Sequence, residues 1–157
     1  MNKKPYRFAS GNMSTGSCVL KITYDDKKYV IAKCKQGYDG LKRIENGLNA
    51  FISTGNNNSA GIYFHLYNYV KKHPHKSFKV EVLLETDNVY QLLVREQEEL
   101  YKGMSDRRFM NNQTEAYIPA YDETKTAYGW IPTHAVLNFK NWMKKNKPPV
   151  KRSPKRS

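Results

Sequence analysis

The sequence predicts an α+β fold, in which a small antiparallel β-sheet carries helices packed on it. Three observations lead to this class. Residues 17–35 alternate apolar and polar side chains on both sides of a polar turn, as a β-hairpin does. Residues 77–85 alternate in the same way, and several other stretches space their apolar residues as helices do. The expected order is β-β-α-α-β-α, followed by a C-terminal helix and a basic tail.

The hairpin is expected to join strands 17–24 and 28–34 through a two-residue turn at Asp25-Asp26. This register points Cys18 and Cys34 to opposite sides of the ribbon. We therefore expect two reduced thiols in an intracellular setting, and not a disulfide framework. The apolar face shared by the two strands would consist of Leu20, Ile22, Tyr24, Tyr29 and Ile31.

The first two helices follow the hairpin. Residues 41–52 have apolar side chains at helical spacing in spite of Gly47, after a glycine-containing break at 35–40. Residues 62–72 have helical length and are apolar on nearly every side, although their β-forming composition leaves a strand as the alternative. The sequence His73-Pro74-His75 ends this element, because a residue before proline disfavours the helical conformation.

The last two helices follow the third strand. Residues 86–102 open with Thr86 and Asp87, which are suitable N-caps, and continue with apolar residues at helical spacing. Residues 103–130 are mixed and rich in turn formers. Pro132 lies near the expected start of the final helix.

These elements divide the chain into four expected parts. Residues 1–16 form an N-terminal arm and residues 17–112 a domain. Residues 113–145 form an irregular extension with the C-terminal helix, and residues 146–157 form a basic tail. The polar start contains no apolar signal segment, and no apolar run reaches the roughly 18 residues of a membrane span.

The charge of the chain indicates a polyanionic partner. The formal net charge is +13, and residues 144–157 contain seven Lys or Arg and no acid. Such asymmetry favours nucleic acid first, and an acidic protein or a membrane surface second. The alternative is a solubilising surface with a flexible basic tail.

Four short stretches together carry a resemblance to a known family. CVLKIT (18–23) and YVIA (29–32) lie on the hairpin strands, LKRI (41–44) lies on the first helix, and VREQ (94–97) lies on the third. Asn111-Asn112 follows at the end of the domain. Taken in order, with their spacing and expected elements, these stretches resemble the GIY-YIG nuclease superfamily over residues 17–112.

The resemblance implies a fold and a site. In this family a glutamate binds one divalent metal ion that helps to hydrolyse a DNA phosphodiester, and an arginine contacts the phosphate. The matching residues here are Glu96 and Arg43. A nuclease of this type would therefore hold a single Mg²⁺ or Mn²⁺ on Glu96. Read without the resemblance, both residues are ordinary solvated charges on helix faces.

The tyrosines with which this family positions and deprotonates water are replaced. The first motif has Leu20 and the second has Val30 at the tyrosine positions, and neither side chain can accept a proton. Tyr29 would substitute only if the hairpin register differed by one residue. A histidine that often follows the arginine falls on Gly47. We therefore expect a catalytically silent relative with no resident cofactor.

If the chain is not catalytic, its basic surface is the remaining candidate for a function. Its candidate nucleic-acid contacts would be independent of base sequence and would weaken with salt. His73 and His75 lack a nearby third ligand for zinc. The candidate basic residues are Lys33, Lys35, Lys42, Arg43, Lys144, Lys145, Lys147, Lys151, Arg152, Lys155 and Arg156.

The sequence therefore predicts a non-catalytic structural or interaction subunit, with other protein subunits as partners, DNA as a further contact and no membrane span. Lys, Asn and Tyr, which have AT-rich codons, make up 46 of the 157 residues. This bias suits a phage of an AT-rich host, so we expect a tail or portal-proximal component located in the virion or the host cytoplasm. The alternatives are a metal-dependent endonuclease and a DNA-binding accessory protein.

Overall fold

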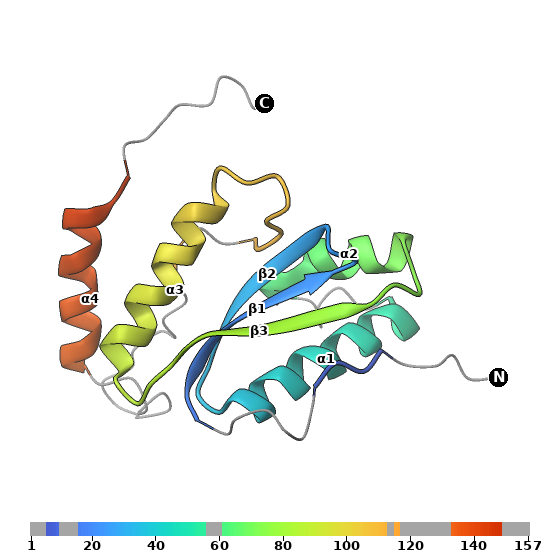
Figure 1. Ribbon diagram of the computed structural model, residues 1–157, viewed down its shortest axis with the longest axis horizontal. Coiled ribbons are helices and arrows are strands. Elements are labelled where there is room, and N and C mark those ends of the chain that lie inside the picture. Colours follow the sequence, from blue (N-terminus) through green and yellow to red (C-terminus); the bar gives the residue numbers. More distant parts are fainter. Residues whose placement is uncertain (1–5, 10–15, 56–60, 113–114, 117–132, 149–157) are drawn as a thin grey trace.

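A three-stranded antiparallel sheet with helices on both faces is the centre of the fold (Figure 1). The computed structural model describes residues 6–9, 16–55, 61–112, 115–116 and 133–148. The strands are β1 (Cys18–Tyr24), β2 (Lys28–Cys34) and β3 (Phe78–Glu85), and their order in the sheet is β2-β1-β3. The predicted α+β class, with a small antiparallel sheet and packed helices, is confirmed.

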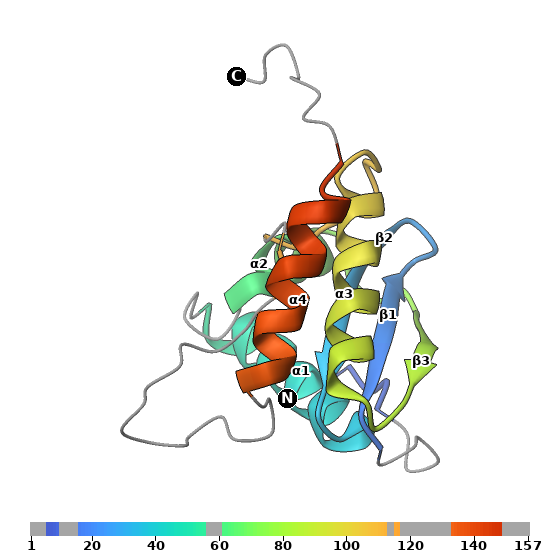
Figure 2. The same ribbon diagram turned by 90° about the vertical axis from the view of Figure 1, so that its left-hand side faces the viewer.

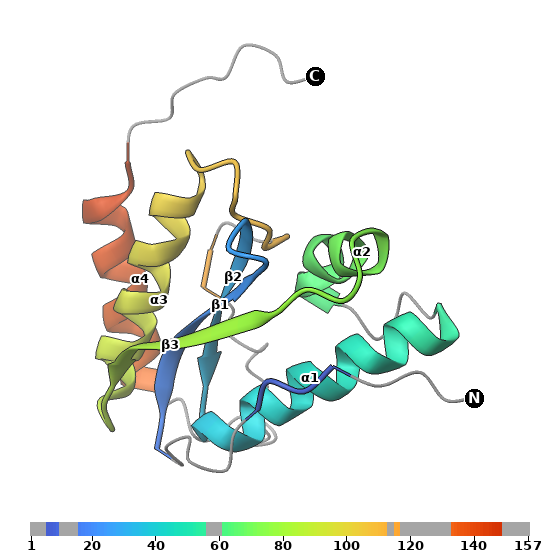
Figure 3. The same cartoon turned by 45° about the vertical axis from the view of Figure 1, so that its right-hand side comes forward.

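The helices form two layers, one on each face of the sheet (Figure 3). One layer contains α1 (Gly37–Thr54), a 3₁₀ turn η2 (Gly61–Tyr63) and α2 (Phe64–Lys72). The other contains α3 (Val89–Gly103) and α4 (Thr133–Asn146), which lie side by side (Figure 2). No helix in the described part of the chain is long and apolar enough to cross a membrane.

Each face of the sheet has its own hydrophobic core. Strand residues alternate between the two cores because successive side chains point to opposite faces. The core under α1 and α2 contains Leu20, Ile22, Tyr24, Val30, Ala32, Leu41, Leu48, Phe51, Leu66, Tyr67 and Val70. The core under α3 and α4 contains Val19, Tyr29, Ile31, Leu92, Leu93, Leu100 and Phe139.

The hairpin register differs by one residue from the prediction. Lys27 N–H does close a turn on the Tyr24 carbonyl at 3.0 Å, and Asp25 and Asp26 have the positive φ that this turn requires. However, Tyr24 pairs with Lys28, so that Lys27 is an extra residue outside the ladder. Tyr29 therefore pairs with Thr23 and lies on the α3 face, as does Ile31; the predicted apolar face was wrong for both.

The same shift corrects the prediction for the two cysteines. Cys18 and Cys34 are direct cross-strand partners and their side chains lie on the same face, not on opposite sides. Both are buried and free. A hydrogen bond joins the two thiols and is the main cause that raises the pKa of Cys34, with burial adding to it.

Helix α1 begins at Gly37, four residues before the predicted start at Leu41. Gly37 and Gly40, which looked like breakers in the sequence, both lie inside the helix. A Cβ at Gly40 would be 2.5 Å from Cys34 Sγ, so the glycine permits this close approach of helix and strand. Here a tertiary contact outweighs the low helix propensity of glycine.

The remaining helices follow the prediction with small differences. Residues 64–72 are helical, so the strand alternative is wrong there, and Tyr67 is buried with its hydroxyl donating to the Ile44 carbonyl at 2.9 Å. The N-cap of α3 is Asn88 and not Thr86 or Asp87, because the Asn88 side chain accepts from Gln91 N–H at 3.0 Å.

The free edge of β2 is covered by residues 108–111. Tyr29 N–H donates to the Arg108 carbonyl at 2.9 Å, and Met110 N–H donates to the Tyr29 carbonyl at 2.8 Å. The Asn111 amide then accepts from Ile31 N–H at 2.8 Å and donates to the Ile31 carbonyl at 3.0 Å. Asn111, noted in the sequence as a family position, thus substitutes for a strand residue.

Candidate functional site

Glu96, the candidate metal ligand, is buried between α3 and β2. Its carboxylate accepts a hydrogen bond from Lys33 Nζ at 2.9 Å, and the two side chains are 3% and 5% exposed. The β2 side chain at 33 alternates with Ile31 and so faces α3. The sequence therefore brings a buried carboxylate together with a buried ammonium group, a pair not foreseen from the sequence.

Burial controls the ionisation of this pair. Desolvation raises the pKa of Glu96, while the charge and the hydrogen bond of Lys33 oppose that rise. The Lys33 ammonium thus supplies the counter-charge that a divalent metal would supply in a nuclease. In the described part of the chain, no group of three or more His, Cys, Asp or Glu residues is arranged to hold a metal ion.

Arg43 is not joined to Glu96. It lies on the exposed side of α1, which packs on the sheet face opposite to α3. Glu96 is instead paired with Lys33, and no ion pair involving Arg43 forms among the described residues. The two residues that the family resemblance selected therefore do not form one site.

The two motif positions that lack tyrosine lie in the core. Leu20 and Val30 are both 0% exposed and contribute to the core under α1 and α2. Neither position is in contact with solvent from which a water nucleophile would be drawn. Both side chains therefore pack in the hydrophobic core.

Tyr29 does not replace the missing tyrosines. Its hydroxyl donates to Asp106 Oδ2 at 3.2 Å, at the turn end of the sheet. Burial, followed by the charge of Asp106, raises the pKa of Tyr29 to about 12. The hydroxyl is therefore a protonated donor to Asp106 at neutral pH.

Tyr63 is an aromatic residue near Glu96 that the sequence did not single out for this role. Burial is the main cause that raises the pKa of Tyr63 well above its usual value, and the charges of Cys34 and Glu96 add to the rise. It lies in η2, at the entry to α2, and packs against the first core. Like Tyr29, it remains a neutral phenol at pH 7.

The candidate basic residues fall into three groups. Lys33 is buried in the pair with Glu96, so a phosphate contact by Lys33 would require that pair to break. Lys42 is 45% exposed on its side chain and donates to Glu45 at 2.8 Å. The exposed members are Lys35, Arg43, Lys144, Lys145 and Lys147; Lys151, Arg152, Lys155 and Arg156 lie outside the described residues.

Glu45 is a buried carboxylate that the sequence reasoning missed. It is 2% exposed and accepts from the backbone N–H groups of Phe8 at 2.6 Å and Ala9 at 2.9 Å. It thereby holds residues 6–9 against α1. The sequence does contain a signal, because Glu45 falls between Leu41 and Leu48 on the apolar stripe of the helix.

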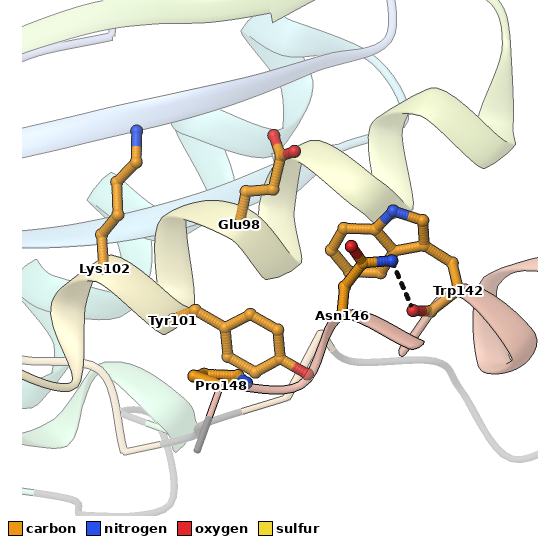
Figure 4. A pocket seen from close by; sticks show the side chains of 6 residues that line it. All are labelled: Glu98, Tyr101, Lys102, Trp142, Asn146 and Pro148. Atoms are coloured by element: carbon orange, nitrogen blue, oxygen red, sulfur yellow. Dashed lines mark hydrogen bonds between the residues drawn. The ribbon is translucent and has the colours of Figure 1, made fainter. Parts of the chain in front are cut away.

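A shallow hollow lies between α3 and α4, away from Glu96. Figure 4 shows Trp142, Tyr101 and Pro148 beside the polar side chains of this hollow. Asn146 Nδ2 donates to the Trp142 carbonyl at 2.8 Å, which fixes the end of α4. The hollow is an open surface feature, lined by Glu98, Tyr101, Lys102, Trp142, Asn146 and Pro148.

Comparison with known proteins leaves the family open. No protein-family model, no curated protein and no solved structure matches this chain. The predicted order of elements, β-β-α-α-β-α, is present through α3, and the class that the structure establishes is α+β.

Proposed function

We propose that this chain is a non-catalytic domain of GIY-YIG type that acts as a structural or interaction subunit. In this proposal the assembly is a phage particle, in which the chain is a tail or portal-proximal component present in the virion and the host cytoplasm. Its partners are other protein subunits, and its basic surface contacts DNA. The AT-rich codon bias of the sequence supports the phage assignment.

The ion pair between Lys33 and Glu96 is the observation that carries the non-catalytic part. Metal-assisted hydrolysis needs a carboxylate that is open to a cation and to substrate. Glu96 is 3% exposed on its side chain and is already neutralised by an ammonium group at 2.9 Å. A divalent ion would have to break the buried pair of Lys33 and Glu96, at a cost of several kcal/mol.

The proton-transfer groups support the same conclusion. A nuclease of this type needs a tyrosine that orders or deprotonates water, and here the corresponding positions are Leu20 and Val30 in the core. The tyrosines that remain nearby, Tyr29 and Tyr63, have raised pKa values. A domain whose described residues place the carboxylate in a buried ion pair and apolar side chains at the tyrosine positions is suited to packing and binding.

The nuclease alternative is tested by plasmid nicking. We expect supercoiled DNA to stay intact when it is incubated with the purified chain in Mg²⁺ or Mn²⁺, because Glu96 is held in an ion pair with Lys33. Gel electrophoresis over hours at micromolar protein measures this directly. Metal-dependent nicking that is abolished in Glu96→Gln, with circular dichroism unchanged, would show that the domain is an active endonuclease.

The assembly part is tested by mass. We expect light scattering at micromolar concentration to give a mass above the 18.3 kDa of one chain, because a structural subunit carries surfaces that fit its neighbours. The measurement is repeated over a tenfold range of protein and at two salt concentrations. A single-chain mass under all of these conditions contradicts self-assembly and favours the DNA-binding accessory protein.

A further inference from the structure

Three chain segments meet at the end of the sheet where the β1–β2 turn lies. Asp25 N–H donates to the Ser77 carbonyl at 2.8 Å, and the Tyr24 hydroxyl donates to the His73 carbonyl at 2.6 Å. Lys28 Nζ donates to the Arg107 carbonyl at 3.4 Å. These bonds hold residues 24–29, 69–79 and 104–110 together, and we call the surface they form the turn-end surface.

The turn-end surface concentrates positive charge. Its three segments contain eight Lys or Arg and three Asp, whereas the rest of the described chain contains twelve Lys or Arg and nine Asp or Glu. Seven of the eight bases are exposed and Lys28 is partly exposed. The bases are Lys27, Lys28, Lys71, Lys72, Lys76, Lys79, Arg107 and Arg108.

The three acids of this surface have local roles. Asp25 and Asp26 occupy turn positions with φ of 58° and 55°, which Asp tolerates better than most residues. Asp106 accepts from the Tyr29 hydroxyl at 3.2 Å and from Arg108 N–H at 2.9 Å. The acids are therefore explained by the turn and by the cover of β2, and two of the lysines, Lys28 and Lys71, have contacts within the chain.

The composition of the surface fits phosphate better than an acidic protein. Lysine is depleted in the cores of protein–protein interfaces, which use aromatic and other apolar anchors. Six of the eight bases here are lysines, and the partly buried aromatic residues Tyr69 and Phe78 are used in internal packing. Lysine and arginine on a fixed backbone are the usual contacts to a nucleic-acid backbone.

We propose that the turn-end surface binds the phosphate backbone of DNA, without reading base sequence. This inference rests on the DNA contact in the proposed function and assigns it to a different place from the basic tail. Lys72, Lys76, Lys79 and Arg107 each present an exposed side chain there, and none of them forms an ion pair with a described residue. These four charges are free to meet phosphates.

The test compares two variants of the full chain that lose the same charge. The first replaces Lys72, Lys76, Lys79 and Arg107 by Gln, and the second replaces Lys144, Lys145, Lys147 and Lys151 by Gln. Fluorescence anisotropy with a 20-base-pair duplex measures affinity between 50 and 300 mM salt, and thermal unfolding checks the fold. We expect the turn-end variant to bind at least about tenfold more weakly and to reduce the salt slope by about 3 to 4.

Each outcome decides between the proposals. The turn-end variant could bind with the wild-type affinity and salt slope while the tail variant loses binding. This result overturns the assignment of the DNA contact to the turn-end surface but leaves the DNA contact itself in place. A wild-type chain that does not bind the duplex overturns both. If the wild type binds poly-glutamate through the turn-end residues but does not bind DNA, the partner is an acidic protein and the nucleic-acid assignment is wrong.

Discussion

Replacing Lys33 by Met is expected to destabilise the fold by about 3–5 kcal/mol at neutral pH, because it leaves the buried Glu96 carboxylate without its cation. Urea unfolding measures the loss. Arg95→Met is the matched control, since Arg95 pairs with Glu99 on the same helix at a partly exposed site. That control is expected to lose less than about 1 kcal/mol.

The pH dependence of this variant identifies the cause. Burial raises the pKa of folded Glu96 above its usual 4.5. The substitution removes the positive charge and the hydrogen bond of Lys33, which oppose this rise. A folded pKa above the unfolded one means that the folded state holds the proton more tightly, so stability falls as pH rises from 4.5 to the folded value. We expect the variant to be closer to wild type at pH 5 than at pH 7.5.

A double variant separates the loss of the pair from the loss of packing. Lys33→Met with Glu96→Leu removes both charges, and such replacements are often neutral or stabilising. We expect it to recover most of the stability that the single variant loses. Two results would show that the buried charge of Glu96 is not the cause. The double variant could be as unstable as Lys33→Met, or Lys33→Met could lose the same stability at pH 5 as at pH 7.5.

Replacing Glu45 by Gln is expected to cost about 2–3 kcal/mol and to release residues 6–9 from α1. The carboxylate accepts from two backbone N–H groups and from Lys42, and hydrogen bonds to a charged group contribute about 1.5–3 kcal/mol. Hydrogen exchange at Phe8 and Ala9 reports the release, and urea unfolding reports the cost. Asp39→Asn, an exposed acid on the same helix, is the control and should change stability by less than about 0.5 kcal/mol.

The sign of the pH effect at Glu45 is opposite to that at Glu96. Burial alone would raise the pKa of Glu45, but the N–H groups of Ala9 and Phe8 and the Lys42 ammonium hold it below its usual 4.5. The contribution of Glu45 is therefore present above pH 4.5 and is lost as pH falls through the lowered folded value. Protection of Phe8 and Ala9 that persists in Glu45→Gln would contradict this role.

Local periodicity was enough to predict most elements. The alternation of β3 and the apolar spacing of α3 are strong patterns, and both elements lie where they were expected. The start of α1 was missed because Gly37 and Gly40 have low helix propensity; the close approach of Cys34 explains why position 40 is a glycine. Side chains along a strand alternate between its two faces. Because the turn contains one more residue than predicted, Lys27, every β2 side chain lies on the face opposite to the predicted one.

The site was harder to predict for a related reason. Lys33 was predicted as a phosphate contact, which requires an exposed side chain, but α3 covers this side of the sheet and the side chain is only 5% exposed. Glu96 reads as part of a charged helix surface, although it lies opposite Lys33. Neither burial nor pairing is visible without the three-dimensional arrangement, because the two residues are 63 positions apart.

The cover on β2 has a consequence for how molecules of this chain can associate. Residues 108–110 and the Asn111 amide bind the outward backbone groups of Tyr29 and Ile31 on β2, which leaves β3 as the uncovered edge in the described part of the chain. A sheet with two available edges can grow into a fibre, whereas one with a single edge stops after two copies. Within the described part of the chain, pairing through β3 would therefore join two copies and stop, and a larger array would need side-chain surfaces as well.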